Sequence, residues 1–193
     1  MGYEFELKFR TDESVLDALL HDIAGEEQTF LMHTTYYDTP DGHLSARHYT
    51  LRRRMENDRS VCTLKIPAEG LGRGEFELEC DSMEEALPML CKLSGVEDLM
   101  SLTANGLEEV CGAKFTRIAK TINWNGTTLE VALDSGALYG GMRVMPICEV
   151  EVELKDGQKE DAISYGSFLA AAYGLEPETA SKFRRGLALY RGE

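Results

Sequence analysis

Hydrophobic and polar positions alternate strictly in several stretches of the chain. In residues 3–10, four apolar side chains alternate with four charged ones. Successive side chains of a β-strand point to opposite faces, so a period of two predicts a strand. Similar alternation, with β-branched and aromatic residues, predicts about eight strands in all. The others are expected at 29–37, 49–55, 60–66, 75–80, 114–124, 127–138 and 142–155.

Short turn signals join many of these strands in chain order. Residues 56–58, Asn125-Gly126 and Gly140-Gly141 each lie between two expected strands, and such residues favour tight hairpins. Strands joined by hairpins are antiparallel. We therefore expect a mostly antiparallel sheet.

A helical period accounts for several segments between the strands. Apolar positions between residues 15 and 23 fall on one helix face, after a capping residue at Thr11 or Asp12 and before Gly25. Further helices are expected at 83–93, 102–111, 161–173 and 177–191, with a short helical turn at 44–47. Amphipathic helices must cover an apolar face, so the fold class is expected to be α+β.

Charges of both signs share one face of seven expected strands. Arg52 and Arg54 share a face, as do Glu149, Glu151 and Glu153. On one strand, this pattern is typical of a solvated sheet face. Because the pattern repeats and the helices need the opposite, apolar faces, we expect an eight-stranded antiparallel closed β-barrel. Its helices are expected to pack outside, around a charged lumen.

A charged lumen is unusual, because small barrels ordinarily fill with apolar side chains. Charges removed from water cost free energy, so they indicate an ionic ligand rather than structural filler. Arginine forks match phosphate oxygens, and carboxylates suit Mg²⁺ or Mn²⁺. The mixture of signs therefore predicts a site for a linear polyphosphate with bridging metal ions.

The overall charge is strongly acidic. The chain has 193 residues, with 34 Asp and Glu against 20 Lys and Arg, for a formal net charge of −14. This balance argues against nucleic-acid partners and against an anionic membrane surface. The total alone would also argue against an anionic substrate, but the cations on the shared strand faces overturn that conclusion.

The chain shows no sign of export or of a membrane span. No stretch approaches the roughly 20 apolar residues of such a span, and the charged N-terminal stretch has no signal-peptide core. The five cysteines are dispersed, and neither they nor the four histidines have metal-ligand spacing. We expect reduced thiols in a cytoplasmic protein.

The order of the charged motifs resembles that of the CYTH superfamily, the triphosphate tunnel metalloenzymes. Glu4, Glu6 and Lys8 match the ExExK hallmark of the family. The other matches are Tyr36 to Thr39 (the second-strand ending), Leu51 to Arg54 (LRxR), Thr63 to Lys65 (TLK), Arg73 to Glu77 (RxExE), Val131 to Gly136 (ALDxG), Glu149 to Lys155 (ExExELK) and Ser181 to Gly186 (SKxxRG). They follow the family order, so a single CYTH domain is expected over residues 1–193.

This resemblance implies a role for each matching charged residue. The implied ligands of Mg²⁺ or Mn²⁺ are Glu4, Glu6, Asp134, Glu149, Glu151 and Glu153. The implied triphosphate contacts are Lys8, Arg52, Arg54, Lys65, Arg73, Arg117, Lys182 and Arg185. Glu75, Glu77 and Lys8 are the expected catalytic residues, with the two glutamates holding metal or orienting the attacking water.

Simpler roles stay open for some charged residues. Lys120 lies off the face of Arg117, and Asp134 lies in a turn-like sequence that also permits a structural role. The residues compatible with solvated or helix-terminal positions are Arg10, Arg47, Arg53, Glu79, Glu153, Lys182 and Arg185.

The favoured function is metal-dependent hydrolysis of a triphosphate, most simply inorganic triphosphate to diphosphate and phosphate. Charge neutralisation and positioning are the main requirements of phosphoryl transfer. Within the same resemblance, the alternatives are a class IV-type adenylate cyclase and a thiamine or nucleoside triphosphatase. The non-enzymatic alternative is a polyphosphate-binding module. The expected partner is a small-molecule triphosphate, without nucleic acid or membrane, and the sequence does not predict the oligomeric state.

Overall fold

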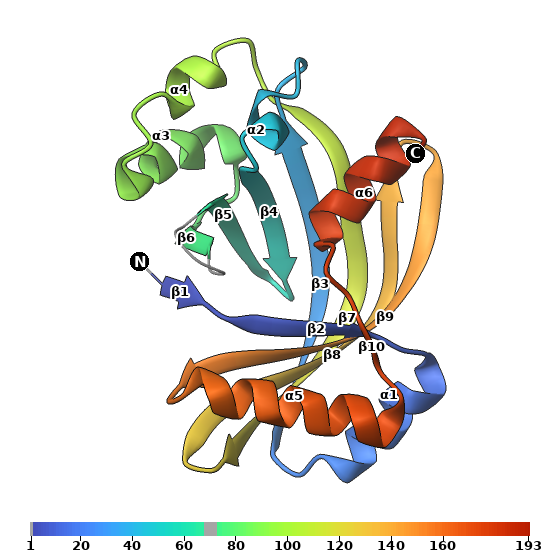
Figure 1. Cartoon of the computed structure of the whole chain (residues 1–193). Helices are drawn as coiled ribbons and strands as arrows, with labels where there is room; N and C mark the ends of the chain where they lie inside the picture. The colour runs from blue at the N-terminus through green and yellow to red at the C-terminus, as the bar shows by residue number, and fades with distance from the viewer. Residues whose placement is uncertain (1, 68–72) are drawn as a thin grey trace.

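A single antiparallel sheet dominates the computed structural model, which describes residues 2–67 and 73–193, without the side chains of residues 2–4 and 73 (Figure 1). Its strands are β1 (Gly2–Glu4), β2 (Glu6–Arg10), β3 (Glu26–Asp38), β4 (Thr50–Glu56), β5 (Arg59–Pro67), β6 (Arg73–Glu79), β7 (Glu108–Trp124), β8 (Thr127–Gly140), β9 (Arg143–Asp156) and β10 (Glu176–Pro177). Their order is β1-β6-β5-β4-β3-β7-β8-β9-β2-β10, and every neighbouring pair is antiparallel.

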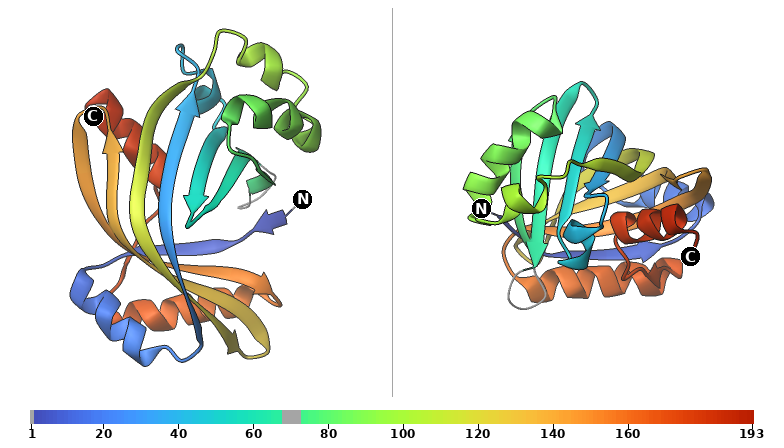
Figure 2. Two further views of the ribbon diagram at one scale, coloured as in Figure 1. Left: turned by 180° about the vertical axis from the view of Figure 1, so that it is seen from behind. Right: turned by 90° about the horizontal axis from the view of Figure 1, so that it is seen from above.

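Helices cover the apolar outer face of the sheet at two places (Figure 2). The helices are α1 (Glu13–Asp22), α2 (His43–Ala46), α3 (Met83–Ser94), α4 (Leu99–Leu102), α5 (Lys159–Tyr173) and α6 (Lys182–Arg191). One apolar core joins α1 and α5 to strands β2, β8 and β9, and a second joins α3 and α4 to strands β4, β5 and β6. The α+β class is therefore confirmed.

The predicted closed barrel is not confirmed. The segment expected as one strand is divided at the buried Phe5: β1 pairs with β6, whereas β2 pairs with β9. The two halves of this segment reach opposite margins of the curved sheet, but no hydrogen-bonded ladder joins the margins among the described residues. The division at Phe5 and the short β10 also explain why the sheet has ten strands rather than eight.

Two expected helices differ in the structure. The prediction of a helix at 102–111 is wrong. The helix α4 ends at Leu102, Gly106 has a φ of 96°, and β7 begins at Glu108. Pairing of β7 with β3 as far as Asp38 outweighs the local helical pattern. The last helix begins at Lys182 rather than near 177, because residues 176–177 pair with the edge of β2.

The helix α6 does not pack outside the sheet as predicted. Its Phe183 and Leu187 lie in a core with Tyr36 and Cys111, on the sheet face that also carries the charges. A Cβ at Gly140 would lie 2.4 Å from the Gly186 carbonyl oxygen, so a glycine is required for this close approach. Consequently α6 brings its N-terminal residues to the charged face.

Candidate functional site

The register of the sheet aligns charged residues from four strands on one face. Arg117 of β7 pairs with Asp134 of β8, which pairs with Glu149 of β9. Glu151 of β9 pairs with Lys8 of β2. Directly paired residues of an antiparallel sheet share a face, so the expected shared face is present here.

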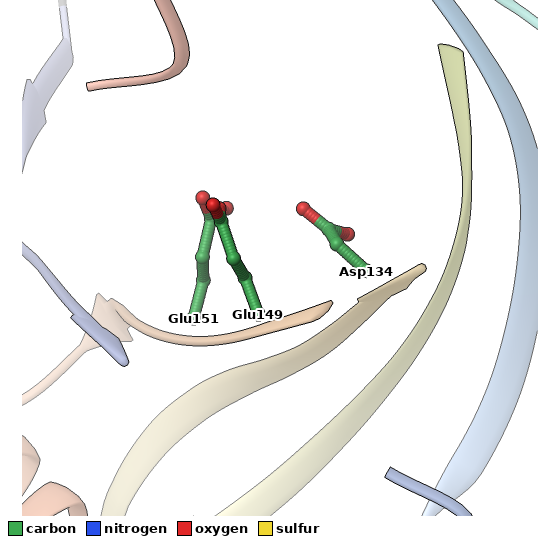
Figure 3. Close-up of side chains that lie close together, drawn as sticks. All are labelled: Asp134, Glu149 and Glu151. Carbon is green, nitrogen blue, oxygen red and sulfur yellow. The ribbon is translucent and has the colours of Figure 1, made fainter. Parts of the chain in front are cut away.

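The centre of this face is a buried carboxylate triad made of Asp134, Glu149 and Glu151 (Figure 3). The Nζ atom of Lys182, at the start of α6, lies 2.8 Å from Asp134 Oδ2, 2.7 Å from Glu149 Oε2 and 2.8 Å from Glu151 Oε1. Asp134 and Glu149 are fully buried. Lys182 therefore belongs to the charged face rather than to a solvated helix end.

Other cations surround the triad. Arg117 makes a bidentate pair with Asp134, with Nε–Oδ1 and Nη2–Oδ2 distances of 2.7 Å, and its Nη2 also contacts Glu151. Arg185 contacts Glu149, and Lys8 Nζ lies 3.4 Å from Glu151 Oε1. Bidentate arginine–carboxylate pairs are the strongest of these contacts.

The neighbouring cations favour the ionised forms of Asp134 and Glu151. Burial by itself raises the pKa of Asp134 and Glu151, but Arg117 and Lys182 outweigh it, so both pKa values lie below their ordinary values. Burial lowers the pKa of Lys182, but the three carboxylates outweigh it and the pKa is raised. Asp134, Glu151 and Lys182 are therefore charged near neutral pH.

The charged face has two walls. The first carries the triad and its cations on β2, β7, β8 and β9, and the second lies on β4, β5 and β6. Arg52 Nη2 lies 3.2 Å from Glu75 Oε1 and 3.4 Å from Glu77 Oε1, and Lys65 Nζ lies 3.1 Å from Glu75 Oε1. Thr63 Oγ1 donates a 2.9 Å hydrogen bond to Glu77. The Glu77 side chain is 47% exposed, so it has more room than Glu75 for a water molecule.

Among the described side chains of this second wall, Arg54 is the most weakly paired cation. Its side chain is buried, its Nε donates to Thr34 Oγ1 at 3.1 Å, and Glu56 Oε1 lies 3.9 Å from its Nη1. Burial, then the charge of Arg52 and that of Arg117 on the other wall, lower the pKa of Arg54. An anion between the two walls would relieve this repulsion.

The triad provides suitable ligands for a divalent cation. Its oxygen atoms lie within 4.8 Å of one another, and carboxylate oxygens are what Mg²⁺ and Mn²⁺ prefer. The Lys182 ammonium lies among the same oxygens, so it has to move before a metal ion can bind there.

The remaining expected metal ligands lie apart from the triad or outside the described side chains. Glu6 and Glu153 are cross-strand partners and are partly exposed, and Glu153 pairs with Lys155 at 2.9 Å. The expected ligand Glu4 and the expected phosphate contact Arg73 have side chains outside the described residues.

The structure assigns other roles to four charged residues. Lys120 lies on the opposite face, where Nζ donates to the Leu20 and Ile23 carbonyl oxygens at 2.6 and 2.9 Å, so it caps the end of α1. The surface or edge contacts of the others are Arg53 to the Asp81 carbonyl, Glu79 to Arg59, and Arg10 to Glu176 and Glu178.

Two residues that the sequence did not single out position the charged groups. Thr34 accepts the hydrogen bond from Arg54. Glu178 is mostly buried, accepts from Ala180 N at 2.7 Å, and lies 3.6 Å from Arg185 Nη1. The position of Thr34 on the charged face of β3 was a usable signal, whereas Glu178 lay within an expected helix and gave none.

A shallow pocket of about 640 Å³ lies across β3, β7 and β8, and it shares Phe115 with the surroundings of Arg117 and Lys182. Its lining includes His33, Asn57, Lys114 and Ser135, and none of the residues expected from the sequence. The charged face remains the better candidate, because it alone gathers the paired cations and carboxylates among the described residues.

The CYTH domain model matches residues 2–187, and the chain belongs to this family.

One curated relative is an inorganic triphosphatase. The chain is 30% identical over 168 residues to an inorganic triphosphatase of Haemophilus influenzae; this covers 85% of the chain and 47% of the relative. The chain thus spans about half the length of this curated relative.

Solved structures share the fold. A candidate adenylate cyclase of Bacillus halodurans has a TM-score of 0.66 and 20% identity, covering 96% of this chain and 98% of that one. The Hippeastrum protein HpAC1, a candidate adenylyl cyclase described as having a dominant triphosphatase activity, has a TM-score of 0.63 and 22% identity, covering 99% and 96%.

Two further findings concern the environment of the protein. No helix in the described part of the chain is long and apolar enough to cross a membrane. All five cysteines are free thiols.

Proposed function

We propose that this protein hydrolyses inorganic triphosphate to diphosphate and phosphate with Mg²⁺ or Mn²⁺. The main support is the pair of facing walls, in which the weakly paired Arg54 of one wall is repelled by Arg117 of the other. The similarity to an inorganic triphosphatase points to the same substrate.

The cations of both walls would bind the phosphates. Each cation whose side chain is described is held by carboxylates or by a threonine, so it is oriented before the ligand arrives. The proposed phosphate-binding residues are Lys8, Arg52, Arg54, Lys65, Arg73, Arg117, Lys182 and Arg185. Their combined charge would offset that of the transferring group.

The carboxylates would divide into metal ligands and groups that orient water. When bound, the metal ion would lower the pKa of a water and offset phosphate charge. Its proposed ligands are Glu4, Glu6, Asp134, Glu149, Glu151 and Glu153. Glu77, which is held by Thr63, would orient the attacking water and accept its proton, and Glu75 and Lys8 would position the groups around it.

The finer features of the fold are also part of this proposal. We infer that β1 and β2 complete a tunnel around the ligand, since they reach opposite margins of the sheet. The chain would form one CYTH domain over residues 1–193. The five free thiols support a reducing compartment such as the cytoplasm.

A substrate panel tests the proposed activity. With Mg²⁺ or Mn²⁺, the protein is expected to release diphosphate and phosphate in equal amounts from inorganic triphosphate. Metal removal by EDTA is expected to stop the reaction, because the metal would supply the activated water. Chromatography of the products measures both effects.

The panel also includes ATP, thiamine triphosphate and long-chain polyphosphate. Cyclic AMP formed from ATP would indicate an adenylate cyclase instead. Preferred hydrolysis of thiamine triphosphate would change the substrate. Tight binding of polyphosphate without turnover would indicate a binding module.

A further inference from the structure

Lys182 lies where a divalent cation of the triad would also lie. Its ammonium is within 2.8 Å of an oxygen atom of Asp134, Glu149 and Glu151. A metal ion bound by the same oxygens would place two like charges within a few ångströms of each other in a buried site. The ammonium and the metal ion therefore exclude one another.

Lys182 Nζ donates 2.8 Å hydrogen bonds to Asp134 Oδ2 and Glu151 Oε1, whereas its contact with Glu149 is of a different kind. Glu149 Oε2 lies 2.7 Å from its Nζ but receives no hydrogen bond among the described residues, so this contact is an ion pair without hydrogen-bond geometry. Lysine carries a point charge on a flexible stem. The ammonium can leave the triad without moving the backbone of α6, which Ser181 caps, once another anion replaces its two hydrogen bonds.

We propose that Lys182 is an exchangeable internal cation of the triad. Without ligand, its ammonium offsets the charge of the three carboxylates. When triphosphate arrives with a divalent cation, the ammonium moves to the phosphate oxygens and the metal ion takes its place. This inference rests on the proposed function only for the identity of the anion.

The exchange has a consequence for binding. A metal ion alone would separate the buried Lys182 ammonium from the three carboxylates. The affinity of the triad for a metal ion alone is therefore low. The triphosphate gives the displaced ammonium a new partner. Metal ion and triphosphate therefore bind cooperatively, each raising the affinity of the other.

Binding of Mn²⁺ without any triphosphate tests the exchange. The loss of the free-Mn²⁺ signal in electron paramagnetic resonance would be titrated for the wild type, Lys182→Met and Lys65→Met. Lys65→Met is the matched control, because it removes the same charge from the opposite wall. We expect Lys182→Met to bind Mn²⁺ at least about tenfold more tightly than the wild type, and Lys65→Met to stay within about threefold.

Equal Mn²⁺ affinities of the two folded variants would overturn the exchange. If Lys182→Met does not fold, anomalous diffraction from wild-type crystals tests the exchange. The crystals would be soaked in Mn²⁺ with and without triphosphate. An anomalous peak in the triad only when triphosphate is also present, with Lys182 turned away, is the expected result. A peak without triphosphate, or none in either soak, would overturn the proposal. Neither readout involves turnover. Failure of the proposed exchange can therefore be distinguished from failure of the proposed hydrolysis.

Discussion

Replacing Arg54 by methionine is expected to lower kcat/KM for triphosphate hydrolysis by about 10³. Arg54 is a buried cation, and among the described residues its ion pair with Glu56 is long, at 3.9 Å. Burial and the charges of Arg52 and Arg117 lower its pKa, so this charge is costly without an anion. The melting temperature of Arg54→Met should therefore not fall, which steady-state kinetics and thermal melting together measure.

The neighbouring residue is the matched control for this variant. The guanidinium of Arg53 donates to the Asp81 carbonyl oxygen at 2.8 Å at the exposed surface. Arg53→Met is expected to keep kcat/KM within about twofold of the wild type, since an exposed charge that donates to a backbone carbonyl oxygen is screened by water and salt. Equal losses in both variants, or full activity in Arg54→Met, would contradict the assigned phosphate site.

Replacing Asp134 by asparagine is expected to lower the free energy of unfolding by about 3 kcal/mol at pH 7. The carboxylate is fully buried and contacts both Arg117 and Lys182. Removing its charge leaves those buried cations under-compensated. Urea denaturation measures the loss. Glu176→Gln breaks an exposed pair with Arg10 and should cost only about 0–1 kcal/mol.

The same variant has a distinctive pH dependence. The pKa values of Asp134 and Glu151 are lowered from 3.8 and 4.5, so the unfolded chain takes up protons first as the pH falls. Their contribution to the free energy of unfolding is complete at pH values above those ordinary pKa values. It is lost as the pH drops toward the lower pKa values of the folded state. As the pH is lowered from about 5 to 3, the urea midpoint of the wild type should decrease. The urea midpoint of Asp134→Asn should decrease less steeply. Equal slopes would contradict the role of the triad.

Local alternation predicted much of this site, because the parity of a strand fixes which side chains share a face. Arg52 and Arg54 were expected on one face from their spacing, and both lie on the charged face of β4. Alternation also placed Asp134 and Glu149 on charged strand faces, and the motif resemblance implied their role as metal ligands. Their direct pairing across β8 and β9 brings them together.

Features that depend on distant pairing were not predictable. The partner change at Phe5 depends on which strands reach each half of the N-terminal segment. The position of Lys182 in the triad depends on α6 crossing the charged face, which the apolar stripe of that helix does not specify. The loss of the helix expected at 102–111 depends on the long pairing of β7 with β3.

A crystal structure of the protein with inorganic triphosphate tests most directly whether the two walls bind one triphosphate. The expected result places phosphate oxygens within hydrogen-bond distance of Arg52 and Arg54 on one wall. The same molecule should contact Arg117 or Lys182 on the other wall. Triphosphate bound away from both walls, for example beside Lys114 in the 640 Å³ pocket, would contradict the assignment.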